Sequence, residues 1–212
     1  MLMEECIYLD KNLLIIGAGA EQVPAYILAK QKGIKTIATD SDSKAPAVKL
    51  ADYFLQVSTR DPKNTAEIAI EFSKKIKIHG VMTIANDVPY TVAVVAEALG
   101  LPGIPVKTAE LFADKTLMKQ AFVSSDVPCP WFAPVSDVTE LERLISNNTA
   151  EQFVIKPVDG RGARGVLIID RDSDLEWAFN EAQRWGESGR IILEEFIPGI
   201  QLSTESFLLG GK

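Results

Sequence analysis

A glycine-rich segment carries the residues best suited to chemistry. It runs from Lys156 to Val166 and reads KPVDGRGARGV, with three glycines and a lysine at its start. Glycines allow a backbone to fold over phosphates with its N–H groups inward, and lysine supplies a compact charge for a phosphate oxygen. The segment is not a P-loop, because no Gly-Lys-Ser/Thr leads into a helix. A β-hairpin with incidental charges is the alternative, although a hairpin needs neither the lysine nor three glycines. We therefore predict a phosphate-binding loop.

Two further segments could contact a nucleotide. Asp114-Lys115 opens a predicted helix, where a lysine in the first turn faces the positive end of the helix dipole at a small cost. That unfavourable charge suggests a role, although a solvated lysine tolerates the position well. Glu194 and Glu195 follow an aliphatic strand, and Pro198-Gly199 then breaks the chain, which frees backbone groups to read a planar base. Taken alone, an acidic strand end with an ordinary turn explains this last segment better.

A second glycine loop lies near the start of the chain, at Gly17-Ala18-Gly19-Ala20-Glu21-Gln22. It falls between a strand and a helix, where the helix N-terminus offers N–H groups to an anion. Asp40 ends the next strand, close to the place of the ribose-binding acid in dinucleotide folds. The sixth position is Gln22 instead of glycine, which disfavours a dinucleotide site. A tight turn of a parallel sheet and a loop that binds a substrate anion both remain open.

Alternating strands and helices position the first glycine loop. The predicted strands are 13–16, 35–39, 53–57 and 80–84. The predicted helices are 25–31, 65–76, which Asp61 and Pro62 open, and 89–99. This alternation indicates a parallel sheet covered on both faces. Leu-Pro-Gly-Ile-Pro at 101–105 cannot continue a helix, so we place a domain boundary there, between residues 1–104 and 105–212.

The pattern changes after the boundary. Helices are predicted at 107–112 and 115–124, and Pro128, Pro130 and Pro134 then indicate an extended connector. Further helices are predicted at 137–146, with an Asp137/Glu140 capping pair, and at 173–184. The predicted strands are 153–156, 165–169, 190–194 and 202–209. Two strands joined by a glycine loop and followed by a helix favour an α+β layer over another parallel repeat.

Composition excludes several classes of protein. The net charge is −7 and the Lys and Arg residues are dispersed, so no continuous basic face is expected for nucleic acid. Cys6 and Cys129 form no CxxC pair, which argues against a disulfide scaffold or a zinc site. No apolar run approaches the ~20 residues of a membrane helix, and the acidic start does not resemble a secretory signal. We expect a cytoplasmic protein, with His79 a surface residue before a strand.

Taken in order, these segments resemble the ATP-grasp superfamily, and within it the biotin carboxylase, purine-biosynthesis and carbamoyl-phosphate-synthase-like ligases. The opening domain resembles the pre-ATP-grasp domain, with Asp40 to Asp52 as its Asp-x-Asp…Pro-Ala…Ala-Asp stretch. The Asp114-Lys115 pair with Lys119 resembles the lysine-bearing helix start, which implies that Lys115 binds the ATP α-phosphate. The implied fold is α/β: a parallel-sheet pre-ATP-grasp domain followed by the first, α+β part of an ATP-grasp domain.

The resemblance implies a role for each site residue. ATP binding is implied for Lys115, Lys156, Gly160, Gly162, Gly165, Glu194, Glu195, Ile197 and Gln201. Substrate binding is implied for Gly17, Gly19 and Gln22, and catalysis for Lys156, Arg161 and Arg164. The Glu195 carbonyl and the Ile197 N–H would pair with adenine. Gln201 stands where the family usually has a glutamate on the ribose, and the Mg²⁺-binding Glu and Glu-x-Asn are expected beyond Lys212.

The implied activity is that of a ligase, which phosphorylates a carboxylate with ATP so that an amine or another nucleophile can attack the acyl phosphate. ATP and Mg²⁺ are the implied cofactors. Small-molecule carboxylates and amines are the implied partners, with a homodimer as a candidate assembly. Two alternatives stay open: an enzyme that phosphorylates bicarbonate, as carboxylases and carbamoyl-phosphate synthases do, and a nucleotide-binding module without turnover. We expect the 212-residue chain alone to be inactive.

Overall fold

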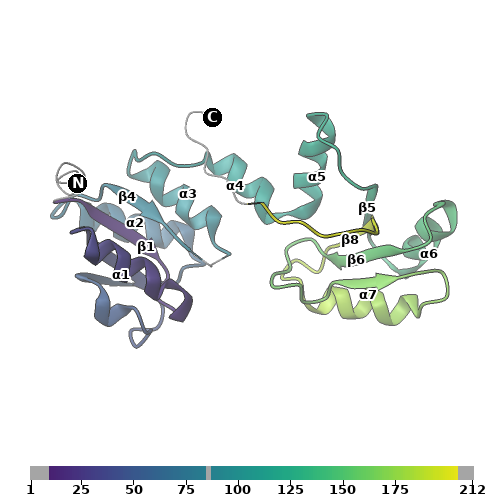
Figure 1. Ribbon diagram of the computed structural model, residues 1–212, viewed down its shortest axis with the longest axis horizontal. Coiled ribbons are helices and arrows are strands. Elements are labelled where there is room, and N and C mark those ends of the chain that lie inside the picture. Colours follow the sequence, from purple (N-terminus) through teal and green to yellow (C-terminus); the bar gives the residue numbers. More distant parts are fainter. Residues whose placement is uncertain (1–9, 85–86, 205–212) are drawn as a thin grey trace. The chain divides into compact units, whose positions relative to one another are not determined.

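The computed structural model describes residues 10–84 and 87–204. The chain forms two compact units, one ending at Met118 and the other beginning at Lys119 (Figure 1). The boundary predicted after residue 104 stays a prediction.

A four-stranded parallel sheet forms the centre of the first unit. Its strands are β1 (Asn12–Ile16), β2 (Lys35–Asp40), β3 (Tyr53–Gln56) and β4 (Gly80–Met82), in the order β3-β2-β1-β4. β1 lies in the interior, and Leu14, Ile15 and Ile16 are fully buried. A strand with both faces covered needs such a continuous aliphatic run, so the predicted parallel α/β arrangement is confirmed.

Helices cover the two faces of this sheet. The long helices are α1 (Val23–Gln31), α2 (Pro62–Ser73), α3 (Pro89–Ala98) and α4 (Val106–Ala113), with short 3-10 turns at Ala20–Gln22 and Val48–Leu50. Ile15 packs with Tyr26 of α1, whereas Leu14 and Ile16 pack with residues of α2 and α3. Adjacent residues of β1 thus belong to the hydrophobic cores on opposite faces of the sheet, because successive side chains of a strand point to opposite faces. α2 begins at Pro62, as the Asp61-Pro62 pair predicts, and Asp61 caps it by accepting from Asn64 N–H at 3.0 Å.

The second unit contains a four-stranded antiparallel sheet with two helices on one face. Its strands are β5 (Phe132–Val135), β6 (Phe153–Pro157), β7 (Leu167–Ile169) and β8 (Ile191–Glu195), in the order β5-β8-β6-β7. The helices α6 (Val138–Asn147) and α7 (Leu175–Arg184) pack on this sheet (Figure 1). The predicted α+β layer is therefore confirmed. α5 (Lys115–Ser124) spans the boundary between the units.

Two sequence-based assignments in this unit were wrong or incomplete. The sequence predicts an extended connector around Pro134, but this segment forms strand β5. Pro134 is tolerated there because β5 is an edge strand, where a missing N–H breaks no ladder on the outer side. The strand predicted at 202–209 is absent over residues 202–204, and residues 205–209 lie outside the described part of the chain.

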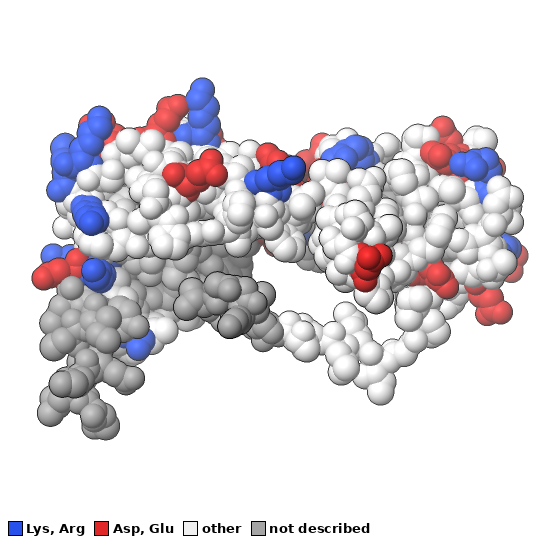
Figure 2. Space-filling view, turned by 90° about the horizontal axis from the view of Figure 1, so that it is seen from above, with Lys and Arg blue, Asp and Glu red and all other residues white. Residues whose placement is uncertain are grey.

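The surface is of mixed charge. On the face drawn in Figure 2, Lys and Arg side chains are interspersed with Asp and Glu. Among the described residues, no helix is both long enough and apolar enough to cross a membrane.

Candidate functional site

The two central strands of the antiparallel sheet expose different residues on their two faces. Phe153, Ile155, Ile191 and Leu193 point into the core beneath α6 and α7. Alternation along each strand places the intervening residues on the opposite face. These are Val154 and Lys156 on β6, and Ile192 and Glu194 on β8. The charged residues of the unit's candidate site therefore lie on the face that the two helices leave open.

Strand register brings Lys156 to Glu194. Lys156 pairs with Ile192 and Val154 with Glu194, so the two charged residues are diagonal neighbours on one face. Lys156 Nζ lies 2.8 Å from Glu194 Oε1, and the Glu194 side chain is only 8% exposed. The approach is close enough for an ion pair but is not aligned as a hydrogen bond, and Oε1 is a buried oxygen without a hydrogen-bonded partner. Glu194 Oε1 is thus held by the charge of Lys156 without a directed hydrogen bond.

A second lysine, Lys119 of α5, contacts the same carboxylate. Lys119 Nζ lies 3.1 Å from Glu194 Oε2, and its side chain is also 8% exposed. It sits 5.7 Å above the centre of the Phe132 ring, and Phe132 is the register partner of Glu194 on β5. The sequence predicts no function of its own for Lys119, because nothing in it distinguishes a buried lysine from a solvated one.

The predicted phosphate loop joins β6 to β7 and is anchored at both ends. At its start, Asp159 Oδ2 accepts a hydrogen bond of 2.8 Å from Ser188 N–H. At its end, Gly165 has a φ of +67° and approaches Trp185 so closely that an added Cβ would lie 2.9 Å from the Trp185 Cβ. Arg164 extends over the same indole, with its guanidinium carbon 5.7 Å from the ring centre. The end of the loop therefore packs against the C-terminal end of α7, and the Arg164 guanidinium lies over the Trp185 ring.

The predicted adenine hinge begins where β8 ends. Glu195 N–H donates to the Trp131 carbonyl at 2.9 Å, and Phe196 N–H donates to the Gln152 carbonyl at 3.0 Å. Ile197 follows with an exposed side chain, and its N–H has no hydrogen-bond partner within the described part of the chain. Gln201 is exposed and lies in no strand or helix. The hinge geometry leaves the Ile197 N–H able to donate to a ligand, as its predicted role requires.

The predicted substrate loop of the first unit is held by internal hydrogen bonds. Ala18 N–H donates to Asp40 Oδ2 at 2.9 Å, and the Gly17 carbonyl accepts from the buried Tyr26 hydroxyl at 2.9 Å. Burial raises the pKa of Tyr26, and the nearby Asp40 charge adds to the shift. Gln22 is buried, and its side-chain oxygen accepts from Ile84 N–H at 3.1 Å. Asp40 and Gln22 therefore shape the loop in this structure, while an added Cβ at Gly19 would meet no atom closer than 3.8 Å.

Lys115 takes its predicted place as the first residue of α5. Asp114 caps this helix, since its Oδ1 accepts from Thr116 N–H at 2.8 Å and from Leu117 N–H at 3.0 Å. An acidic cap offsets the unfavourable placement of a lysine at the helix start. Lys115 belongs to the first unit and Lys156 to the second, so their joint action on one phosphate chain stays a prediction.

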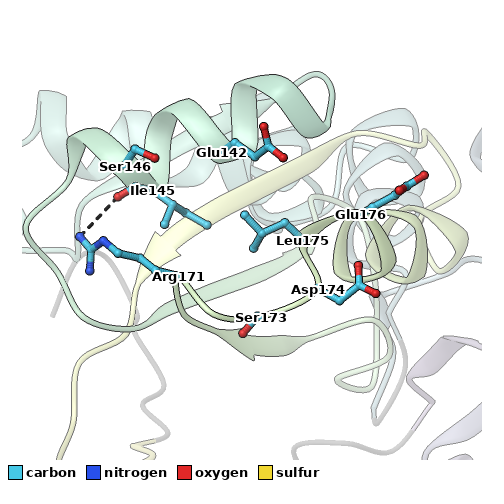
Figure 3. Close-up of a pocket in the computed structure, with 8 residues that line it drawn as sticks. All are labelled: Glu142, Ile145, Ser146, Arg171, Ser173, Asp174, Leu175 and Glu176. Atoms are coloured by element: carbon cyan, nitrogen blue, oxygen red, sulfur yellow. Dashed lines mark hydrogen bonds between the residues drawn. The ribbon is translucent and has the colours of Figure 1, made fainter.

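A separate hollow of about 690 Å³ lies between α6 and the start of α7. Figure 3 shows Ile145 and Leu175 facing each other across it, with Arg171 turned toward the end of α6, where it contacts the Ile145 and Asn148 carbonyls at 3.5 and 2.6 Å. None of the predicted site residues lines the hollow. Its Asp174 accepts from Trp177 N–H at 2.9 Å as the cap of α7. The hollow is thus lined largely by residues of the C-terminal half of α6 and of the N-terminal end of α7.

Comparison with known proteins covers both units. Residues 13–105 match the PylC-like N-terminal domain, and residues 112–212 match the ATP-grasp domain. A D-alanine–D-alanine ligase of Coprothermobacter proteolyticus is 30% identical over 141 residues, which cover 64% of this chain and 40% of that protein. A formate-dependent phosphoribosylglycinamide formyltransferase of Prochlorococcus marinus is 27% identical over 205 residues, which cover 92% of this chain and 50% of that protein.

A solved structure shares the same arrangement. Phosphoribosylglycinamide synthetase from Anaerococcus prevotii is 28% identical with a TM-score of 0.62, over 89% of this chain and 46% of that protein. The chain therefore belongs to the ATP-grasp superfamily, with a PylC-like N-terminal domain preceding its ATP-grasp domain. It spans about half the length, or less, of the curated relatives it matches.

Proposed function

We propose that this chain is the ATP-binding part of a ligase that activates a carboxylate as an acyl phosphate, which an amine or another nucleophile then attacks. The observation that carries the proposal is the Lys156–Glu194 pair on the face of the antiparallel sheet opposite α6 and α7, with Lys156 directly before the three-glycine loop. The membership of the ATP-grasp superfamily supports it. The activity of the whole protein is part of this proposal.

The described residues fit an adenine nucleotide. The Glu195 carbonyl, at the end of β8, is proposed to accept from the amino group of adenine. The Ile197 N–H is suited to donate to a ring nitrogen, and Val154 and Ile168 are opposite each other on β6 and β7, which gives an aliphatic surface for the base. Ile168 is 57% exposed, as expected of a surface that a ligand covers.

The chemistry of phosphoryl transfer relies on positioning and charge neutralisation. Lys156 would leave Glu194 and contact a phosphate oxygen, because a charge-assisted hydrogen bond to phosphate replaces the ion pair it gives up. The loop from Gly160 to Gly165 would close over the β- and γ-phosphates with its N–H groups, and Lys115 would contact the α-phosphate. Arg161 and Arg164 are proposed to neutralise charge on the transferring phosphoryl group.

Mg²⁺ is proposed to accompany the nucleotide, but residues 10–84 and 87–204 contain no group of three His, Cys, Asp or Glu that could hold a metal ion. The described residues therefore do not fit a metal site by themselves, and no step of the mechanism is assigned to the metal.

Small carboxylates and amines are the proposed substrates, with a cytoplasmic location and a homodimer as further expectations. The first glycine loop, at Gly17 and Gly19, is the proposed contact of the substrate anion.

Bicarbonate as the phosphorylated acid is the second candidate, since carboxylase-type enzymes share this fold. A screen of carboxylates, amines and bicarbonate for ADP release by the whole protein, since the 212-residue chain alone is expected to be inactive, separates these two activities, and ATP binding without ADP release from any of them indicates a binding module.

Substitution of Lys156 tests the proposal. Lys156→Ala should weaken ATP binding by about 1 to 3 kcal/mol, the range for loss of a charge-assisted contact. Calorimetric titration with ATP measures the effect, and thermal unfolding shows whether the fold is retained. Lys63→Ala is the matched control, because Lys63 is an exposed lysine of α2. Equal ATP affinity for the wild-type and Lys156→Ala proteins would remove Lys156 from the site and end the proposal.

A further inference from the structure

Lys119 is a buried lysine that the proposed mechanism does not use. The whole residue is 6% exposed, and its ammonium group is 3.1 Å from Glu194 Oε2. Burying an ammonium without a counter-charge is strongly unfavourable, so this pairing stabilises the position of both side chains. The ring of Phe132 beneath the ammonium adds a further favourable contact. Lys119 and Glu194 are therefore a fixed pair at the base of the site.

The charges around Glu194 do not balance. One carboxylate faces two ammonium groups, those of Lys119 and Lys156, which leaves an excess of one positive charge in a largely buried place. An anionic ligand would complete this cluster. The two lysines differ in access, since the Lys156 side chain is 19% exposed and the Lys119 side chain 8%. Lys156 can thus turn to a ligand, while Lys119 is enclosed.

We propose that Lys119 is a positioning residue that retains Glu194 when Lys156 moves to the nucleotide phosphate. With Lys119 in place, the departure of Lys156 still leaves the buried carboxylate paired. Without Lys119, Glu194 is paired with Lys156 alone. Movement of Lys156 to the phosphate would then leave the buried Glu194 carboxylate unpaired, which is costly. This inference rests on the proposed function, because it assumes that Lys156 binds the phosphates of ATP.

Three variants test the inference: Lys119→Met, Glu194→Gln and the double variant. Methionine keeps the length of the side chain without its charge, and glutamine keeps an acceptor oxygen without its charge. Lys119→Met should weaken ATP binding about tenfold while changing adenosine binding less than about threefold, because only ATP requires Lys156 to leave Glu194. Adding Glu194→Gln should restore ATP affinity to that of Glu194→Gln alone, because Lys156 is then no longer held. Calorimetry with ATP and adenosine gives both affinities.

A purely structural role predicts a different outcome. Loss of ATP and adenosine affinity in equal measure, or no recovery in the double variant, would overturn the inference. If Lys119→Met does not fold, the double variant still decides, since it removes both charges of the buried pair: ATP affinity equal to that of Glu194→Gln supports the inference, and affinity about tenfold weaker overturns it. Lys156→Ala separates the two proposals, because unchanged ATP affinity in that variant refutes the proposed function itself.

Discussion

Replacing Gly165 by alanine tests how the glycine loop is anchored. The residue has a φ of +67°, and an added Cβ would meet the Trp185 Cβ at 2.9 Å, Trp185 Cδ1 at 3.0 Å and the Ala182 carbonyl oxygen at 3.2 Å. The left-handed backbone alone costs an alanine roughly 1 kcal/mol. The contacted atoms belong to the Cβ end of the Trp185 side chain and to a helix carbonyl, and neither group can move aside easily. Overpacking therefore adds about 1 to 3 kcal/mol to the destabilisation.

Gly162 supplies a matched control for this substitution. Its φ is +60°, but no atom lies within 4 Å of an added Cβ. Gly162→Ala should therefore cost only the backbone term of roughly 1 kcal/mol, and Gly165→Ala about 2 to 4 kcal/mol in total. Urea unfolding measures both, and Trp185 fluorescence reports whether the loop has left the indole. Equal destabilisation by the two variants, with unchanged fluorescence, would refute the described packing of the loop on α7.

Two further predictions concern the loop and His79. The amides from Gly160 to Gly165 should exchange rapidly without nucleotide and more slowly with ATP, because the loop's turns are closed by long hydrogen bonds of 3.3 Å; hydrogen exchange that ATP does not change would contradict a closing loop. Burial, and then the charges of Lys11 and Lys77, lower the pKa of His79, whose Nδ1 accepts from Asn12 N–H at 3.0 Å. The unfolded chain therefore binds this proton more readily, so the stabilising contribution is complete above about pH 6.5 and declines as the pH falls toward the lowered pKa. His79→Gln should show a shallower loss of stability between about pH 7 and 5, and an identical slope would refute the linkage.

The sequence predicted several elements of both units well because their local signals agree with their packing. The aliphatic run of β1, the Asp61-Pro62 start of α2 and the Asp137 cap of α6 each match the structure. β5 was missed because proline-rich sequence favours a connector, and only the position of Pro134 on a sheet edge makes a strand possible. Such a position depends on strand order, which local sequence does not contain.

The candidate site was predicted in part. The loop and Lys156 are recognisable from residue types, but the Lys156–Glu194 pair follows from the register of β6 and β8. The substrate-binding role of Gln22 stays a prediction, and the hydrogen bonds that Gln22 and Asp40 accept from backbone N–H groups depend on tertiary structure. Lys119 was missed because its burial depends on a partner 75 positions away in the sequence, and a lysine pattern on a helix normally indicates a solvated face.

Labelling with an acyl-phosphate derivative of ATP tests the central claim most directly, because the reagent acylates lysines next to the bound phosphates. The account predicts that Lys156 is labelled, with Lys115 as the second site, that excess ATP prevents the reaction, and that the exposed Lys63 gives only labelling that ATP does not suppress. Peptide mass spectrometry identifies the modified residues. Labelling confined to exposed lysines, and unaffected by ATP, would contradict the claim that this chain binds ATP through Lys156 and its glycine loop.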